Sequence, residues 1–156
     1  MRMRVLAIGT RMPAWVEEVF RDYARRMAGT LPLELRELAA GPREKSGKAG
    51  RALELEAERL LAELRPDDFV VALDEHGREL STDELARWLG VRMQEGRDVA
   101  FLIGGPDGLA PRVLGRSDLT WSLSRLTFPH ALVRVLLAEQ LYRAHTLLAG
   151  HPYHRA

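Results

Sequence analysis

The sequence contains a glycine-rich turn with the composition of a small-molecule site. An apolar run, Val99–Ile103, ends abruptly in Gly104-Gly105-Pro106. Ligands of open α/β sheets bind beyond the carboxyl ends of strands, and glycines let backbone amides approach a ligand without an intervening Cβ. The alternative is a tight turn that binds nothing. The spacing is not Gly-x-Gly-x-x-Gly, which disfavours a Rossmann dinucleotide site.

A second candidate site is the stretch Trp121–His130, which joins a short strand to the last helix. It presents backbone N–H and C=O groups in non-repetitive structure, flanked by Leu123, Leu126 and Phe128. This mixture suits a ligand with an apolar arm and a polar purine. A core-filling strand followed by an ordinary helix start explains the same residues, so both interpretations stay open.

The carboxyl-terminal residues His151–Ala156 include Tyr153, His154 and Arg155. Tyrosine and histidine rings stack on unpaired bases and arginine binds phosphate, so these residue types suit a nucleotide site. The alternative is a chain end that frays because it has few apolar residues, with its histidines exposed to solvent.

Other ionisable residues indicate no further chemistry. Glu139 and Arg143 lie four residues apart in the last predicted helix, in the order that favours a surface ion pair. His130 and His145 have no metal-ligand spacing with a third donor, so we expect no metal site. No Ser-His-Asp or paired-carboxylate arrangement is recognisable.

Length and composition favour one domain over residues 1–156. Hydrophobic residues make up 46% of the chain and charged residues 29%, which is typical of globular proteins. The absence of cysteine excludes disulfides and thiolate sites and favours a reducing compartment, the cytoplasm. The apolar runs are too short for export or for a membrane span. A net charge of +1 attracts no polyanion globally, so nucleic-acid binding must rest on local patches.

Alternating apolar and amphipathic segments predict an α/β fold with a mostly parallel sheet flanked by helices. Continuous apolar runs are typical of strands buried on both faces, and Ser81 with Glu84 matches the capping box of a helix start. The predicted strands are Met3–Ile8, Leu33–Leu38, Phe69–Leu73 and Val99–Ile103. The predicted helices are Pro13–Gly29, Ala52–Leu64, Ser81–Gly96 and Pro129–Ala149.

Residues 41–50, Gly-Pro-Arg-Glu-Lys-Ser-Gly-Lys-Ala-Gly, contain three glycines and little that can be buried. They predict a mobile basic loop, for which a solvated connector is the favoured interpretation. A phosphate-binding loop is the alternative, but the segment lacks the Gly-Lys-Ser/Thr ending of that motif.

The last predicted helix, Pro129–Ala149, is apolar around most of its circumference. A helix of this kind is buried on more than one side. Its own sheet covers one side, and a second copy of the chain is a candidate for another.

A set of short motifs runs through the chain in a fixed order. They are Gly9-Thr10-Arg11-Met12-Pro13-x-Trp15, Leu102-Ile103-Gly104-Gly105-Pro106-x-Gly108-Leu109, Trp121-Ser122-Leu123-Ser124, Leu126-Thr127, Pro129-His130, Leu132-Val133-Arg134-Val135, Glu139-Gln140-Leu141-Tyr142-Arg143-Ala144 and His151-Pro152-Tyr153-His154-Arg155. In order and spacing the chain resembles the bacterial 23S rRNA pseudouridine N3-methyltransferases of the SPOUT class. The resemblance covers essentially the whole chain, and its terminal motif is far more specific than a glycine turn.

This resemblance implies a single SPOUT domain whose carboxyl-terminal segment threads through a loop to form a trefoil knot, a rare exception to un-knotted topology. It implies a homodimer, with S-adenosylmethionine bound at the knot and an RNA site completed by the partner subunit. It also implies methyl transfer to N3 of a pseudouridine in 23S rRNA, which we expect on the assembled ribosome.

The resemblance carries functional residues over to this chain. The implied cofactor-binding residues are Leu73, Gly105, Leu123, Ser124, Arg125, Leu126, Thr127 and Phe128. The implied substrate-side, catalytic residues are Arg143, Tyr153, His154 and Arg155. Positions 125 and 128 vary in the family pattern, so we expect their backbones to matter more than their side chains. Ala156 stands where some relatives have an acidic residue, which argues against a role for a terminal carboxyl side chain.

The implied reaction asks little of the protein, because S-adenosylmethionine carries an activated methyl group on a sulfonium. The pseudouridine N3 must be aligned with that methyl group and must lose its proton. We assign His154 as the first candidate base. Arg155 or Arg143 is the candidate cation that stabilises the N3 anion.

Two other functions stay open. Another SPOUT methyltransferase, for example one acting on tRNA, would share the glycine turn and the knot but should lack the terminal motif. A non-catalytic ribosome-binding protein would need no cofactor, and binding of S-adenosylmethionine separates it from both enzymes.

Overall fold

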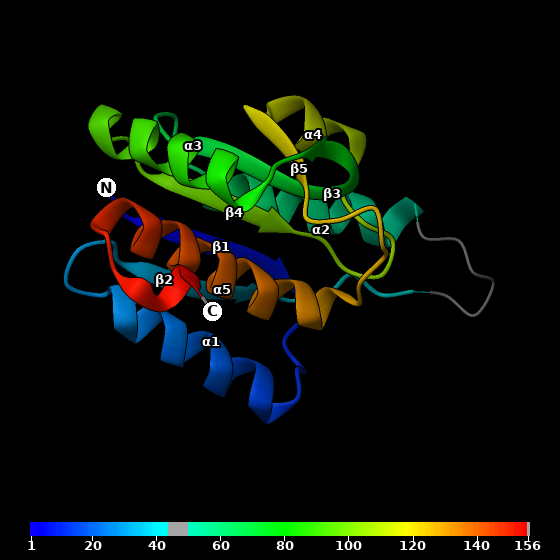
Figure 1. Cartoon of the computed structure of the whole chain (residues 1–156). Helices are drawn as coiled ribbons and strands as arrows, with labels where there is room; N and C mark the ends of the chain where they lie inside the picture. The colour runs from blue at the N-terminus through cyan, green and yellow to red at the C-terminus, as the bar shows by residue number, and fades with distance from the viewer. Residues whose placement is uncertain (44–49, 156) are drawn as a thin grey trace.

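The computed structural model describes residues 1–43 and 50–155, in which strands and helices alternate (Figure 1). The strands are β1 (Met3–Ile8), β2 (Leu33–Leu38), β3 (Phe69–Glu79), β4 (Val99–Ile103) and β5 (Leu119–Ser122). The helices are α1 (Ala14–Met27), α2 (Gly50–Glu63), α3 (Thr82–Glu95), α4 (Pro111–Arg116), α5 (His130–Ala149) and the 3-10 helix η1 (Pro152–Arg155). The predicted basic loop at 41–50 falls mostly outside the described residues, as does Ala156.

The strands form one parallel sheet with the order β2-β1-β4-β3-β5. β1 lies between β2 and β4, so that Val5 is opposite Leu35 on one side and Phe101 on the other. β3 pairs with β4 and β5, also in parallel. The carboxyl ends of the strands therefore meet at one edge, and the predicted parallel α/β sheet is confirmed.

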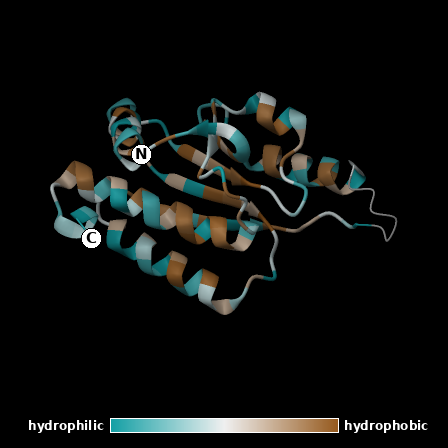
Figure 2. Ribbon diagram, turned by 45° about the vertical axis from the view of Figure 1, so that its right-hand side comes forward, coloured by the Kyte–Doolittle hydropathy of each residue, from teal (hydrophilic) through white to brown (hydrophobic). Residues whose placement is uncertain are grey.

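The sheet separates two hydrophobic cores, because successive side chains of a strand point to opposite faces. Val5 of β1 faces the core shared with α1, α3 and α5, whereas Leu6 faces the core shared with α2 and α4. Burial on both faces explains why β4 and the first five residues of β3 are continuous apolar runs, whereas the edge strand β2 alternates imperfectly between apolar and charged residues. Figure 2 shows the apolar strands enclosed between helices whose outer surfaces are largely hydrophilic.

Local sequence signals place the ends of α3. The Ser81 hydroxyl accepts the Glu84 N–H at 3.1 Å, and the Glu84 carboxylate accepts the Ser81 N–H at 2.9 Å. Gly96 ends the helix with a φ of 75°, a left-handed conformation that favours glycine. The predicted capping box is confirmed. The short helix α4 was not predicted, because six residues are too few for a periodic pattern.

The structure differs from the sequence prediction in β3, which continues past Leu73. Leu73 and Arg78 both pair with Trp121 of β5, so residues 74–77 bulge out of the pairing. Gly77 packs so closely on β5 that a Cβ would lie 2.7 Å from its backbone. The polar residues of the bulge hid the continuation of the strand from sequence reasoning.

Residues Pro152–Arg155 form the helix η1, so the described part of the tail does not match the alternative of a frayed end. η1 packs against α5, and the Tyr153 ring meets the Tyr142 ring edge-on with 4.6 Å between centroids. The trefoil knot stays a prediction. Within the described residues, no helix is long and apolar enough to span a membrane.

Candidate active site

A cavity of about 510 Å³ lies at the carboxyl ends of β4 and β5, beside the bulge of β3. Its walls come from that bulge, the segments that follow β4 and β5, and the first turn of α5. Its volume falls within the range of about 300–1,000 Å³ that is typical of small-molecule sites. The lining residues are Leu73–His76, Ile103–Leu109, Trp121–Ser124, Leu126–His130 and Val133.

A second hollow of similar volume runs along α1. Its lining includes Glu17 and Arg21, which pair with each other on the exposed helix surface at 2.6 Å. Among its described lining residues, only Leu33 belongs to a strand, and it lies at the amino end of β2. The cavity at the carboxyl edge is therefore the better candidate for chemistry.

The glycine turn after β4 forms one wall of the cavity. The Gly108 N–H donates to the Gly105 carbonyl at 3.0 Å and closes the turn. A Cβ on Gly104 would overlap the Gly108 carbonyl, so this position requires glycine. Gly108 has a φ of 74°, which also favours glycine. The turn consequently presents backbone to the cavity without intervening side chains.

The bulge of β3 and the loop after β5 form another wall. The Thr127 hydroxyl donates to the Glu75 carboxylate at 3.1 Å and joins the two segments. The Ser122 hydroxyl donates to the Ser124 carbonyl at 2.8 Å, and the Leu126 N–H donates to the Ser124 hydroxyl at 3.0 Å. These bonds hold the loop in a non-repetitive conformation beside the cavity.

The structure brings most of the predicted cofactor residues to this one cavity. Those that line it are Leu73, Gly105, Leu123, Ser124, Leu126, Thr127 and Phe128. Arg125 is exposed and does not line the cavity. Contact of these residues with a cofactor stays a prediction.

Sequence reasoning missed three carboxylates that line the cavity, those of Asp74, Glu75 and Asp107. In the described part of the chain, no lysine or arginine lines it. The cavity therefore suits a ligand that carries positive charge. Gly77 was an available signal for the first two residues, because a glycine inside a strand often marks a bulge.

His130 begins α5 and lines the cavity. Burial lowers its pKa below the ordinary 6.5, and the nearby cations Arg134 and Arg43 lower it further, against an opposite effect of Glu56. The imidazole is therefore neutral near pH 7 and adds no positive charge to the cavity wall.

Arg134 is fully buried and ties α5 to the end of β1. Its Nη2 donates to the Ile8 carbonyl at 3.2 Å and to the Gly9 carbonyl at 2.8 Å, while Nη1 pairs with Glu37. A buried arginine needs such partners, because an unpaired buried charge is strongly destabilising. These bonds fix the start of α5, and with it His130, to the sheet.

Two of the predicted substrate-side residues, Arg143 and Tyr153, meet beside the second half of α5, whereas Arg155 is exposed at the end of η1. The Arg143 Nε donates to Glu139 at 2.8 Å, and its guanidinium lies 5.1 Å from the Tyr153 ring centroid. The Tyr153 hydroxyl lies 3.3 Å from both the Tyr23 hydroxyl and the Glu139 carboxylate. The expected ion pair of Glu139 and Arg143 is confirmed, and it also holds the tail.

The charge states of this cluster follow from its contacts. Burial and the hydrogen bond with Tyr23 raise the pKa of Tyr153, so the phenol stays protonated at neutral pH. Pairing with Glu139 raises the pKa of Arg143 and keeps it cationic. His154 is half-buried, and its Nδ1 has no hydrogen-bond partner among the described residues.

The cavity and the tail lie apart within one chain. A helical rise of about 1.5 Å per residue puts roughly 20 Å between His130 and Arg143 of α5. Figure 1 shows the tail, in red, folded back beside α1, whereas the yellow segment that leads into α5 lies at the opposite end of this helix. The predicted catalytic residues of one chain therefore do not reach its own cavity.

Comparison with known proteins identifies the family. Residues 1–154 match the sequence model described as "Predicted SPOUT methyltransferase". The chain belongs to the SPOUT methyltransferase family. Relatives of this SPOUT methyltransferase named "Ribosomal RNA large subunit methyltransferase H" are similar over their whole length. The one from Alkalilimnicola ehrlichii is 54% identical over 100% of both chains, and that from Chromohalobacter salexigens is 53% identical over 99% of this chain and 100% of the relative.

A third relative of the same name, from Thioalkalivibrio sulfidiphilus, is 52% identical over 99% of both chains. The solved structure of a methylase family protein from Neisseria gonorrhoeae matches 90% of this chain and 81% of that protein, with a TM-score of 0.50 and 14% identity. At this identity the likeness shows the fold alone. The expected SPOUT class and its α/β architecture are confirmed.

SPOUT methyltransferases take the methyl group from S-adenosylmethionine, and the cavity of this enzyme fits that cofactor. The cofactor has a sulfonium, an ammonium and a carboxylate, hence a net positive charge. The carboxylates of Asp74 and Glu75 complement that charge, whereas the Asp107 carboxylate is paired with Arg43. Leu73 and Phe128 offer apolar contact for the adenosyl part.

Proposed function

We propose that this SPOUT methyltransferase methylates N3 of a pseudouridine in 23S rRNA on the assembled ribosome. The observation that carries the proposal is the identity of 54% over 156 residues with a relative named Ribosomal RNA large subunit methyltransferase H. The terminal motif His151–Arg155 supports the same substrate. A ribosomal substrate implies a cytoplasmic location.

The cavity at the carboxyl edge is the proposed cofactor site. When bound, S-adenosylmethionine supplies a methyl group that is already activated on its sulfonium. The chain excludes water from this group and aligns it with the attacking nitrogen. Gly105 and the loop Leu123–Phe128 provide the backbone contacts, and Leu73 contributes the apolar contact at the end of its strand.

The tail supplies the proposed proton chemistry. His154 is the base that accepts the N3 proton, and Arg143 and Arg155 are the cations that stabilise the N3 anion. Tyr153 acts as a stacking surface and hydrogen-bond donor, because its raised pKa keeps the phenol protonated.

A second copy of the chain completes the proposed site. Methyl transfer requires reacting atoms about 3–3.5 Å apart, far less than the separation of cavity and tail within one chain. Leu132, Val135 and Leu136 remain partly exposed on α5 and offer apolar surface to a partner. In the proposed homodimer, the tail of one subunit lies over the cavity of the other.

The direct test uses ribosomes from a strain that lacks the modification. The protein and S-adenosylmethionine are added, the rRNA is digested, and mass spectrometry is used to search for N3-methylpseudouridine. We expect one added methyl group on a pseudouridine of 23S rRNA. His154→Ala should lower turnover at saturating substrate by about 100-fold or more, the contribution of a general base. Unchanged turnover would exclude His154 as the base.

Two negative outcomes separate the alternatives. If 23S rRNA stays unmethylated while S-adenosylmethionine binds, another RNA such as tRNA is the substrate. If calorimetry detects no binding of S-adenosylmethionine, a non-catalytic ribosome-binding role replaces the enzymatic one.

The shared site can be tested by mixing two inactive variants. Gly104→Ala disrupts the cavity and His154→Ala removes the base, so each homodimer has two defective sites. A heterodimer has one intact cavity facing one intact tail, and random exchange of subunits should restore roughly a quarter of wild-type activity. If mixing restores nothing, each chain forms its site from its own residues.

A further inference from the structure

Glu56 is a buried carboxylate to which methyl transfer assigns no role. It lies on α2 with 2% of its surface exposed. Its Oε2 accepts the Gly41 N–H and the Arg43 Nη1 at 2.8 Å each, and its Oε1 accepts the Arg43 Nη2 at 3.2 Å. A buried carboxylate persists only when it is paired and hydrogen-bonded. The helix therefore holds Arg43 in one orientation.

Arg43 connects this carboxylate to the glycine turn. Its Nε donates to the Asp107 carboxylate at 2.7 Å, so one guanidinium joins two acidic residues. Hydrogen bonds first with Glu56 and then with Asp107 raise the pKa of Arg43 and keep it cationic. Because the guanidinium is a planar fork, these bonds fix direction as well as distance.

Gly105 packs directly on the Arg43–Glu56 pair. A Cβ at Gly105 would lie 3.7 Å from both the Arg43 Nη2 and the Glu56 Oε1. Gly105 and Asp107 also line the cavity. The turn is thus supported by the pair at its start and bonded to it at its tip, so the position of this cavity wall depends on both contacts.

We propose that Arg43, held by Glu56, is a positioning residue that fixes the glycine turn for the cofactor through Asp107. The inference rests on the proposed function, since it takes the cavity as the cofactor site. A turn already held in its binding geometry loses little freedom when the cofactor binds, which strengthens affinity. The described start of the basic stretch 41–50 supports the site, rather than serving only as the solvated connector that the sequence favoured.

The test is calorimetry of S-adenosylmethionine binding to the full chain, with the melting temperature of the cofactor-free protein recorded for each variant. Asp107→Asn and Arg43→Gln should each raise Kd by about 3- to 10-fold. The melting temperature of Asp107→Asn should hardly change, because its side chain is 40% exposed. A lower melting temperature with unchanged Kd in both variants would mean a purely structural role and would overturn the proposal.

An exposed ion pair on the same helix provides the control. Glu54 lies two residues before Glu56 on α2 and pairs with Arg112 at 2.6 Å on the surface. Glu54→Gln and Arg112→Gln should leave Kd unchanged. The double variant Arg43→Gln/Asp107→Asn should bind no more weakly than Arg43→Gln, because both changes remove the same contact. Additive losses would show that Asp107 acts independently and would overturn the proposal.

S-adenosylhomocysteine, which lacks the sulfonium charge, separates positioning from direct contact. Positioning through the turn predicts the same increase in Kd for both ligands in Asp107→Asn. A loss confined to S-adenosylmethionine would mean that Asp107 itself binds the charged cofactor, and would overturn the proposal. If the wild-type chain binds neither ligand, the proposed function fails. Wild-type binding with unaffected variants refutes this inference alone.

Discussion

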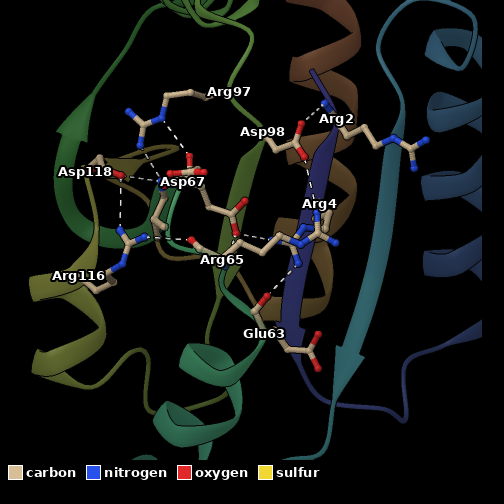
Figure 3. Close-up of polar contacts among 11 residues, drawn as sticks. Arg2, Arg4, Glu63, Arg65, Asp67, Arg97, Asp98, Arg116 and Asp118 are labelled. Carbon is tan, nitrogen blue, oxygen red and sulfur yellow. Dashed lines mark hydrogen bonds and ion pairs between the residues drawn. The ribbon is translucent and has the colours of Figure 1, made fainter.

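The amino ends of the strands are closed by ion pairs, whereas the carboxyl ends surround a cavity. At the amino edge, Arg4 pairs with the buried Asp68, and its Nη1 donates to the Glu63 carbonyl at 3.0 Å. Beside it, Arg97 donates to the Asp67 carbonyl at 3.0 Å. Figure 3 shows these side chains converging from several segments of the chain. Most donors and acceptors at this edge satisfy one another, although the buried Nε of Arg4 has no partner among the described residues.

A buried arginine, Arg134, also lies at the carboxyl edge of the sheet, but its surroundings differ from those of Arg4. Arg134 binds the carbonyls of Ile8 and Gly9, much as Arg4 binds that of Glu63. Here, however, the glycine turn and the β3 bulge keep the next segments away from the strand ends. The same device therefore stabilises the amino edge of the sheet and, at the carboxyl edge, anchors α5, whose first turn lines the cavity.

The largest expected effect lies at the amino edge. Asp68→Ala leaves the buried Arg4 without its carboxylate, and breaking a buried pair costs about 3–5 kcal/mol. Denaturant unfolding should show this loss in the free energy of unfolding, while the folded variant keeps its cofactor Kd. Asp67→Ala is the control, because this exposed residue accepts the Arg97 hydrogen bond through its backbone carbonyl, which alanine retains. A higher cofactor Kd in Asp68→Ala would contradict the prediction that the amino edge affects stability and not cofactor binding.

At the carboxyl edge, Gly104→Ala should damage the site more than the fold. The added Cβ overlaps the Gly108 carbonyl, and such overpacking costs about 1–3 kcal/mol. Since the turn must shift, we expect S-adenosylmethionine to bind at least about tenfold more weakly in calorimetry. Gly115→Ala is the control: a Cβ there meets nothing within 4 Å, and alanine should stabilise α4 by about 0.5–1 kcal/mol. If Gly104→Ala bound S-adenosylmethionine with the wild-type Kd, the glycine turn would not be part of the cofactor site.

Arg134→Lys sharpens the comparison between the two buried arginines. Lysine keeps the charge but lacks the planar fork that reaches Glu37 and the two β1 carbonyls together. We expect a loss of about 1–3 kcal/mol in unfolding free energy from unsatisfied acceptors. Cofactor Kd should rise as well, whereas Arg4→Lys should lower stability only. If calorimetry gave the same cofactor Kd for Arg134→Lys and Arg4→Lys, the two arginines would not differ in their effect on the cofactor site.

The smallest expected effect is a pH dependence of stability. Burial first, then Arg134 for His130 and His151 for His145, lowers the pKa of both histidines below 6.5 in the folded chain. Below pH 6.5 the unfolded chain therefore binds more protons than the folded chain. The contribution of the two neutral histidines to the free energy of unfolding is complete above pH 6.5 and is lost as pH falls toward their lowered pKa values. In denaturant unfolding at several pH values, His130→Gln and His145→Gln should each make the free energy of unfolding depend less steeply on pH below 6.5. If both variants kept the wild-type pH dependence of the free energy of unfolding, other ionisable groups would be responsible for that dependence.

Much of the fold could be predicted from the sequence because the signals are local. Val99–Ile103 is a run of apolar residues that suits only a doubly buried strand or a helix, and flanking glycines favour the strand. Ser81 and Glu84 are three residues apart, so their reciprocal hydrogen bonds need no distant partner. The polar bulge after Leu73 was missed because β5 holds it, about 45 residues later in the chain.

The cavity was partly predictable for a similar reason. The glycine turn and the loop Leu123–Phe128 each follow a strand, and parallel strands bring their carboxyl ends to one edge. The acidic residues that line the same cavity gave no periodic or motif signal. Asp107 in particular occupies a variable position of its motif, so only its contact with Arg43 reveals a role.

The sequence by itself determined most of the helices and strands, together with the glycine turn and the loop after β5 that line the cavity, because neighbouring residues decide these features through burial period, capping and turn geometry. The tertiary structure alone decided which charges meet between elements that are far apart in the chain. Arg43 contacts both Glu56 and Asp107 because α2 packs on the face of the sheet that β1 and β4 form, next to the turn that follows β4. It also placed Arg143 about 20 Å along α5 from His130, which lines the cavity of the same chain, since a rigid helix separates the two residues.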